Sequence, residues 1–429
     1  MNPIAKKILI TLGFLLVYRI LAYVPVPGVN IDVVKQFFTS HSGDALGMLN
    51  MFSGKAVSRL SIISLGIMPY ITASIIMELL AATFPNLGKL KKEEMEKYMQ
   101  IIRYATVAIT LVQAVGVSIG LQSMTGSNGE SAIMIDSNTF IIVSAFTMLA
   151  GTMILMWIGE QITQRGIGNG ISLIIFAGIV SSIPSAIGGT LNSVDTGELN
   201  VITLLAIIVI MLVTIGVIIY VELGERRIPI TYQKTFMMQN QNKRIMNYIP
   251  IKVNLSGVIP PIFASAVLMF PTTVLQAATN PYLVALRDFL NPNGLFFNLL
   301  MFLFVIFFAY FYASITFNAK DIAENLKKQK GFIPGIRQGN AAKEFLNEVA
   351  SRLTFWGAIY LGIIAVVPWL LVKSMGVPFY FGGTAVLIVV QVAIDTMRKI
   401  QAQLMMQKYD TISITGLWFF PLWGFIIMY

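Results

Sequence analysis

Few residues in this chain of 429 could carry out acid–base or metal chemistry. The sequence has no cysteine and a single histidine, His41. The absence of cysteine excludes disulfides, iron–sulfur clusters, cysteine zinc sites and thiol nucleophiles. No partner motif surrounds His41, so it is interpreted as a loop residue rather than a catalytic one. Neither an HExxH nor a GxxxxGK[ST] motif is present, so no zinc protease site, nucleotide-hydrolysing P-loop or other cofactor site is expected.

The remaining acid–base candidates lie at or near the ends of apolar segments. Charged groups are costly inside a bilayer, so each of them is a candidate functional site. The six are Glu78, Arg103, Glu160, Glu222, Asp395 and Arg398. Snorkelling of the charged ends to the membrane interface explains most of these positions, and Asp395 is interpreted as structurally paired. The centres of the segments are almost free of charge, which argues against a membrane-embedded enzyme.

The glycines of RGIGNG (165–170) are the one pattern that resembles a phosphate-binding loop. No strand is predicted before them, so a turn between two helices is the better interpretation.

The charged candidate residues must be positioned by long apolar segments. Hydrophobic residues make up 56% of the chain and charged residues 12%, about half of the ~25% charged content of soluble proteins. Crossing the hydrocarbon core takes about 20 apolar residues. Candidate spans are 8–25, 61–82, 101–122, 139–158, 170–188, 201–221, 255–275, 296–317, 354–372 and 383–405. The first is interpreted as a retained helix, because Arg19 interrupts it and no small-residue cleavage site follows.

Lysine and arginine are unevenly distributed between the connecting loops, in a chain of net charge +10. With the N-terminus inside, the basic residues gather in the loops on one side, chiefly 222–253 and 318–353, and these loops are large enough to project from the membrane. Loops 123–138 and 189–200 on the other side contain neither residue, while 276–295 has only Arg287 and 373–382 only Lys373. The positive-inside rule therefore predicts that both ends of a ten-helix core are cytoplasmic.

Ten spans divide into two sets of five, which we interpret as an N-terminal half (1–190) and a C-terminal half (191–410), followed by an apolar tail (411–429). An odd number of spans per half allows the halves to be inverted copies about an axis in the membrane plane. The short apolar stretch 44–60 is either re-entrant or an interfacial loop. Pro69 and Pro260–Pro261 are predicted to kink or weaken two of the spans. From the residues alone, a channel, a carrier and a scaffold all remain open.

Five motifs resemble the SecY family of bacterial protein-conducting channels. They are MFSGKAVSRLSIISLGIMPYITASII (51–76), GEQITQRGIGNGISLIIFAGIV (159–180), VNLSGVIPPIFASAVLMFP (253–271), NAKDIAENLKKQKGFIPGIRQG (318–339) and GGTAVLIVVQVAID (382–395). They occur in the family's order. The resemblance implies an all-α membrane protein with ten helices in two inverted halves around an hourglass pore. It also implies the transport of unfolded secretory chains across the bacterial plasma membrane and the lateral release of apolar segments into lipid.

The resemblance assigns roles to individual residues. An aliphatic pore ring would consist of Ile67, Ile71, Ile175, Ile262 and Ile388. An apolar ring excludes ions by dewetting and has no polar group to grip a passing chain. A plug at about 45–60 would include Met51, Phe52, Ser53 and Gly54. A lateral gate between the second and seventh helices would include Pro69, Ser74, Pro260, Pro261 and Phe270.

The basic loops would dock partners through Arg226, Arg227 and Arg337. The partners implied by the resemblance are SecE, SecG, the SecA ATPase, the ribosome, precursors with signal sequences and the lipid bilayer. Three features depart from the family pattern: Gln338 stands where proline is usual, 233–247 is less basic than expected, and the tail 411–429 is apolar. The Gln338 position predicts a less rigid loop tip. The alternative function, a secondary transporter of a small solute, would need a polar site at the midplane.

Overall fold

The computed structural model describes residues 3–40, 53–122, 131–197, 200–232, 247–275, 280–291, 294–375 and 383–423. The N-terminal half contains α1 (Pro3–Leu21), α2 (Ile31–Ser40), α4 (Met68–Thr83), α5 (Pro85–Glu93), α6 (Met95–Gln122), α7 (Ser137–Arg165) and α8 (Gly170–Asp195). The C-terminal half contains α9 (Val201–Leu223), β1 (Glu225–Tyr232), β2 (Asn247–Lys252), α11 (Ile259–Leu275), α12 (Pro281–Phe289), α13 (Leu295–Thr316), α14 (Ala319–Lys328), β3 (Gly331–Phe332), α15 (Asn340–Met375) and α16 (Gly383–Trp423).

Each of the ten predicted spans coincides with a helix. Within the described ranges, α6, α7, α8, α9, α13 and α15 are long and apolar enough to cross a membrane on their own. The pair α4 and α5 is bent by 113° at its junction. If the pair counts as one span, it is the seventh candidate for crossing the membrane in the described residues. The helices α1, α11 and α16 occupy the other predicted spans. A multi-span helical membrane protein is therefore the architecture, while the count of ten stays a prediction.

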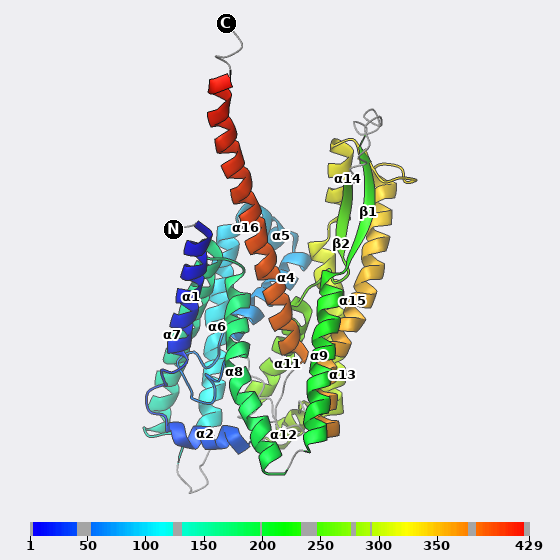
Figure 1. Cartoon of the computed structure of the whole chain (residues 1–429). Helices are drawn as coiled ribbons and strands as arrows, with labels where there is room; N and C mark the ends of the chain where they lie inside the picture. Colours follow the sequence, from blue (N-terminus) through cyan, green and yellow to red (C-terminus); the bar gives the residue numbers. More distant parts are fainter. Residues whose placement is uncertain are drawn as a thin grey trace.

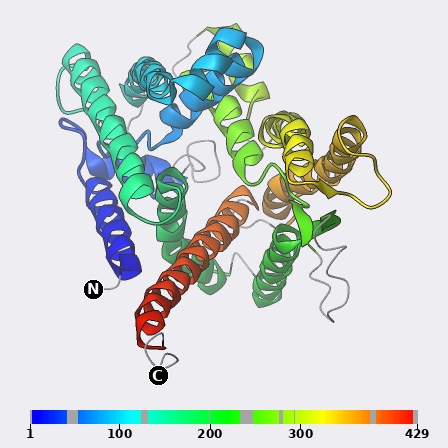
Figure 2. The same ribbon diagram turned by 90° about the horizontal axis from the view of Figure 1, so that it is seen from above.

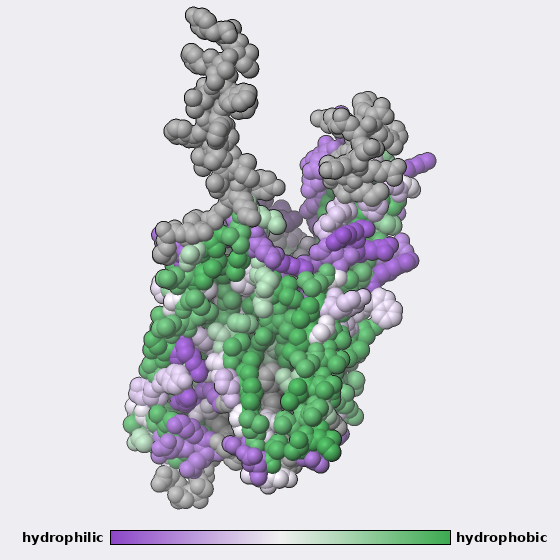
Figure 3. Space-filling view, in the orientation of Figure 1, coloured by the Kyte–Doolittle hydropathy of each residue, from purple (hydrophilic) through white to green (hydrophobic). Residues whose placement is uncertain are grey.

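The two ends of the bundle differ in charge. On the face shown in Figure 3, apolar residues cover most of the middle of the molecule, and hydrophilic residues gather toward its upper and lower ends. The N-terminus, α5, the β1–β2 hairpin and α14 all lie at the upper end, whereas α2 and α12 lie at the lower end (Figure 1). The basic segments thus share one end of the molecule, as the positive-inside rule requires.

A small sheet projects from this basic end. Its strand order is β2-β1-β3, and both pairings are antiparallel. Ile228 and Ile251 face a small hydrophobic cluster that they share with Ala323 and Leu326 of α14 and Leu346 of α15. The described strands of the hairpin therefore pack against α14 and the start of α15.

The prolines expected to kink the second and seventh spans lie instead in the first turns of their helices. Met68 begins α4, with Pro69 beside it, and Ile259 begins α11 just before Pro260 and Pro261. Proline costs nothing there, because the first-turn N–H groups have no partner within the helix. The kink prediction was wrong for these residues. Pro184 of α8 and Pro271 of α11 do lie inside their helices, and the sequence analysis did not single them out.

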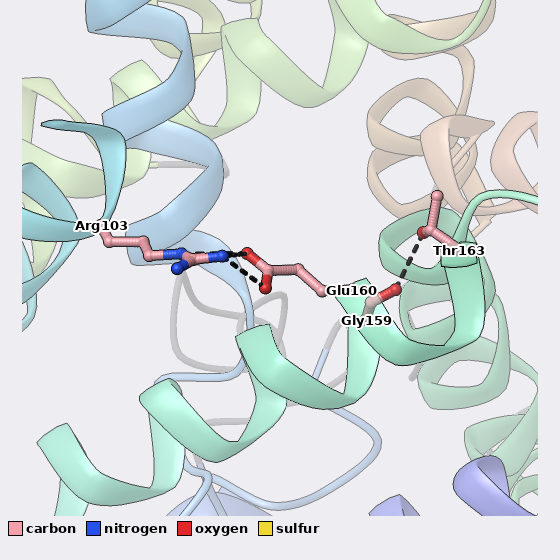
Figure 4. A network of polar contacts seen from close by, with 4 residues as sticks. All are labelled: Arg103, Gly159, Glu160 and Thr163. Carbon is pink, nitrogen blue, oxygen red and sulfur yellow. Dashed lines mark hydrogen bonds and ion pairs between the residues drawn. The ribbon is translucent and has the colours of Figure 1, made fainter. Parts of the chain in front are cut away.

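Two of the charged residues at the span ends form an ion pair between neighbouring helices. Arg103 of α6 donates hydrogen bonds from Nη2 to both carboxylate oxygens of Glu160 in α7, at 3.0 and 2.8 Å, and from Nε at 3.2 Å (Figure 4). The Glu160 side chain is largely buried, whereas that of Arg103 is half exposed. A forked guanidinium–carboxylate contact has more geometric specificity than one made by lysine. The pair ties α6 to α7 near the basic end.

We expect Arg103→Ala to lower the stability of the bundle by about 1–2 kcal/mol, because it leaves the Glu160 carboxylate without its donor. The measurement is the thermal unfolding midpoint in detergent, which should fall by a few degrees. Arg103→Ala combined with Glu160→Gln should recover part of the loss, because the double variant has no uncompensated charge. Strictly additive effects of the two substitutions would show that the pair makes no energetic contribution.

Candidate functional site

Four of the five isoleucines assigned to a ring belong to one large hydrophobic core cluster, and the fifth, Ile262, packs against it. Ile67 directly precedes α4 and Ile71 lies in its first turn, Ile175 belongs to α8, Ile262 to α11 and Ile388 to α16. Their exposed fractions are 4%, 5%, 6% and 1% for Ile67, Ile71, Ile175 and Ile388, and Ile262 is partly buried against the same cluster. These five side chains are bulky and have no polar atoms, a chemistry that excludes water and binds nothing specifically.

Both halves of the chain contribute to this cluster. Seen from above, the helices of residues 1–195 lie mainly on the left and at the top, and those of 200–375 lie on the right (Figure 2). Contacts between α4 and α11, and between α8 and α16, connect the two sides. The cluster is therefore built where the halves meet, and any separation of them would open it.

The described part of the segment between α2 and α4, residues 53–67, is largely buried inside the N-terminal half. Over the described residues 53–67 it forms consecutive turns, and Ala56, Leu60 and Ile63 are fully buried. Val26 donates from its backbone N–H to the Leu60 carbonyl at 2.8 Å, and Ile62 to the Val24 carbonyl at 2.9 Å. The burial argues against an interfacial loop for residues 53–60. Met51 and Phe52, which were assigned to the same plug, lie outside the described residues.

Side chains of α1 and α8 hold the start of this segment. The Tyr18 hydroxyl donates to the Ser53 carbonyl at 3.2 Å, and Arg19 Nη1 donates to the Gly54 carbonyl at 3.0 Å and to Ser181 Oγ at 3.1 Å. Sequence reasoning assigned no partners to Ser53 and Gly54. The position of Arg19 inside an otherwise apolar first helix was the one available signal, because an intramembrane arginine needs acceptors.

A second contact fixes the same segment further along. The Arg59 guanidinium lies over the ring of Tyr23, 3.9 Å from its centroid, and Arg19 lies 5.0 Å from the same ring. Tyr23 follows the end of α1. Cation–π contacts of this kind are worth about 0.5–1 kcal/mol at exposed sites.

We expect Gly54→Ala to weaken the seating of this segment. Gly54 has a φ of +66°, and a Cβ there would come within 2.9 Å of Ser181 Oγ and 3.1 Å of both Gly178 Cα and Tyr18 Oη. Overpacking of this kind costs about 1–3 kcal/mol, so the leak of ions through reconstituted vesicles should rise about tenfold. The matched control is Gly66→Ala. Gly66 has a φ of +58°, and a Cβ added there would have no atom closer than 3.9 Å. Equal leaks in the two variants would contradict a packing role for Gly54.

The residues assigned to a lateral gate lie on two helices that touch. Pro69 and Ser74 belong to α4, and Pro260 and Pro261 belong to α11. The three prolines are buried, and Ser74 turns its hydroxyl to the Ile71 carbonyl of its own helix at 2.8 Å. No hydrogen bond from Ser74 to α11 is therefore needed to satisfy its hydroxyl. Phe270 lies in α11, and its side chain lies outside the described residues.

The assigned docking arginines are exposed at the basic end. Arg226 and Arg227 lie on β1, and the Arg227 guanidinium lies 4.9 Å from the centroid of Tyr248 on β2. Arg337 projects from the turn between β3 and α15. In that turn Gln338 Nε2 donates to the Gly331 carbonyl at 3.0 Å. Proline could not make this bond, so Gln338 ties the loop where a looser tip was expected. Residues 233–246 of the less basic stretch lie outside the described residues.

The turn RGIGNG connects α7 to α8, as predicted. Asn169 accepts a hydrogen bond from the Ile171 N–H at 3.1 Å and so caps α8. Gly170 packs on the Gly159 backbone, so closely that a Cβ would overlap the Gly159 carbonyl. The glycines serve close helix packing.

Comparisons with known proteins agree on one family. The profile of the SecY family matches residues 61–397. The Helicobacter pylori (strain ATCC 700392 / 26695) protein translocase subunit SecY is 69% identical over 418 residues, which cover 97% of this chain and 99% of that protein. The Escherichia coli (strain K12) protein of the same name is 39% identical over 96% of this chain and 94% of its own length. The chain belongs to the SecY family.

Solved structures show the same fold as this SecY-family chain. The structure of a protein-conducting channel superposes with a TM-score of 0.67 at 19% identity, covering 93% of this chain and 92% of the other. Canine Sec61 in a ribosome–channel complex from the endoplasmic reticulum gives a TM-score of 0.63 at 18% identity, with the same coverage. At these identities the likeness concerns the fold alone.

Proposed function

We propose that this SecY-family chain is the channel subunit of a protein translocase, which passes unfolded secretory chains across the bacterial plasma membrane. The observation that carries the proposal is the packing of Ile67, Ile71, Ile175 and Ile388, and of the partly buried Ile262, in one hydrophobic cluster to which both halves contribute. Branched aliphatic side chains seal around chains of varied sequence, since they repack at little cost and offer no hydrogen bond to hold the chain.

The seal and the gate work together in this proposal. The segment around Ser53 and Gly54 covers the outer side of the isoleucine cluster when the channel is closed. A signal sequence enters as an apolar helix between α4 and α11, which separates the two halves and opens the cluster. Transmembrane segments leave through the same opening into lipid, because burial in hydrocarbon is favourable for about 20 apolar residues.

The basic end receives the partners. SecA or the ribosome docks on the β1–β2 hairpin and the loop of Arg337, and both ends of the helical core face the cytoplasm. SecE and SecG complete the membrane complex. Energy comes from ATP hydrolysis by SecA, from translation or from the membrane potential, so the chain itself acts as a passive channel rather than an enzyme. A ribosome-bound Sec61 channel shares this fold, which supports a ribosome as one partner.

The experiment is reconstitution of the chain with SecE in lipid vesicles, followed by addition of SecA, ATP and a secretory precursor. We expect the precursor to become protected from added protease only when ATP and SecA are both present. The control is vesicles with SecE alone. A precursor that remains fully accessible to protease, although the chain is inserted, would overturn the channel function.

A further inference from the structure

Glu222 is a buried carboxylate that the proposed transport path does not use. It lies in the last turn of α9 with an exposed fraction of 4%, and its Oε1 accepts a hydrogen bond from Nδ2 of Asn254 at 2.6 Å. Asn254 is 2% exposed. Most of the charged residues at span ends were expected to reach the interface, and Glu222 is an exception. A buried charge persists only where hydrogen bonds offset part of its desolvation cost.

The Asn254 side chain also shapes the turn that leads into α11. Its Oδ1 accepts from the Gly257 N–H at 3.0 Å and from Ser256 Oγ at 3.1 Å, while Nδ2 donates to the Gly257 carbonyl at 3.2 Å. Gly257 has a φ of +65°, and α11 begins two residues later at Ile259. A single amide thus connects the end of α9 to the start of the helix that carries Ile262.

The same two residues flank the β1–β2 hairpin. The ladder pairs Glu225 with Lys252, and the Val253 N–H donates to the Gly224 carbonyl at 3.0 Å just below it. The hydrogen-bonded ladder therefore continues without a gap down to the Glu222–Asn254 contact. We use the name hairpin clasp for the hydrogen bond between Glu222 and Asn254 together with the turn 254–257. An ion pair between Lys252 and Asp395 of α16, at 3.9 Å, is half exposed and adds little.

We propose that the hairpin clasp couples the β1–β2 hairpin to α11, so that a partner docked on the hairpin displaces the helix that carries Ile262. This inference rests on the proposed function, because it needs a partner at the basic end. Glu222 and Asn254 act as positioning residues and touch neither the partner nor the passing chain. Coupling between distant sites needs a contiguous, stiff connection that is biased from both ends, and this ladder, clasp and helix form one.

Without the clasp, the hairpin remains joined to α11 through the backbone and the bond between Val253 and Gly224. The hairpin should then tilt under a docked partner while α11 keeps its position. Binding at the hairpin would be retained and its effect on the gate would be lost. A merely structural role for the clasp would instead reduce folding or partner binding.

The test uses a reporter of the distance between α4 and α11. The chain has no cysteine, so Ile76→Cys in α4 and Val267→Cys in α11 can carry a pair of spin labels without further changes. Purified bacterial ribosomes are the docking partner, added to the labelled chain with SecE in lipid nanodiscs. The two readouts are ribosome affinity and the ribosome-induced change in the spin–spin distance distribution.

We expect Asn254→Asp to keep ribosome affinity within about twofold and to reduce the ribosome-induced population shift about tenfold, since a carboxylate has no N–H to donate to Glu222 or to the Gly257 carbonyl. Glu222→Gln keeps an acceptor for Asn254 and should behave as the wild type. The double variant Glu222→Gln/Asn254→Asp restores a donor and an acceptor in exchanged positions and should regain most of the shift. Glu222→Met, which removes the acceptor at similar volume, replaces Asn254→Asp if that variant does not assemble.

The matched control is Asn298→Asp in α13, a buried asparagine that donates to the Gly294 carbonyl at 2.8 Å, close to the first turn of that helix. It should leave both readouts unchanged. A full distance shift in Asn254→Asp, a loss of its ribosome binding, or no recovery in the double variant would each overturn the coupling role. Failure of the wild-type chain to bind ribosomes would instead count against the proposed function.

Discussion

Ile388→Asn should open the channel to ions and to precursors with defective signal sequences. Ile388 is 1% exposed and lies in the central hydrophobic cluster. An amide placed there without a hydrogen-bond partner costs about 1–3 kcal/mol in the closed, dry state. Water solvates the same amide when the cluster opens, so the closed state alone is destabilised. The open fraction should therefore rise roughly tenfold or more.

Two measurements check this expectation: the ion conductance of vesicles that contain the variant, and the export of precursors whose signal sequence has lost hydrophobic residues. Ile262→Asn should act in the same direction with a smaller effect, because Ile262 is only partly buried. The control is Ile208→Asn on α9, which makes the same chemical change on a side chain that is half exposed on the outer surface of the bundle. An unchanged leak and unchanged signal stringency in Ile388→Asn would contradict the sealing role.

The second large effect is expected at the other end of the molecule. Arg337→Glu should reduce SecA-driven export about tenfold while the protein still inserts and assembles with SecE. The side chain is exposed and far from the hydrophobic cluster, so its replacement leaves the fold intact. Reversing a charge at a docking surface replaces attraction by repulsion, which lowers the rate of encounter and the specificity of binding.

ATP-dependent uptake of a precursor into vesicles measures the effect, and immunoblotting of the membrane fraction measures assembly. The control is Lys328→Glu, which makes the same change in charge sign on an exposed residue of α14, close to the same loop. Equal losses in both variants would mean that only the overall positive field matters, and that loss should then disappear at high salt. Normal export by Arg337→Glu would refute the docking role.

Local properties of the sequence were sufficient for the membrane class and for the gathering of the basic segments at one end of the molecule. Every predicted span overlaps a helix, because long apolar segments have no stable alternative to a helix in lipid. The basic loops lie together because lysine and arginine are kept on one side of the membrane during insertion. Neither property depends on which helices become neighbours.

Helix boundaries and side-chain partners were less predictable. Pro69 lies inside an unbroken apolar run, so hydropathy could not distinguish a kinked span from a helix that starts at Met68. Arg103 and Glu160 are separated by 57 residues, and Glu222 and Asn254 by 32. No periodicity in the sequence relates such pairs. Each partner, considered alone, is only a charged or polar residue at the end of a span, so the pairing could not be predicted.

The sequence by itself determined that this chain is a multi-span helical membrane protein with one basic face, and its motifs identified the family. The tertiary structure decided which apolar side chains meet in the middle and which charged groups turn inward. The reason is physical. Burial in lipid depends on the composition of each segment, whereas an isoleucine in a shared cluster and one that faces lipid differ only in which helix packs beside it.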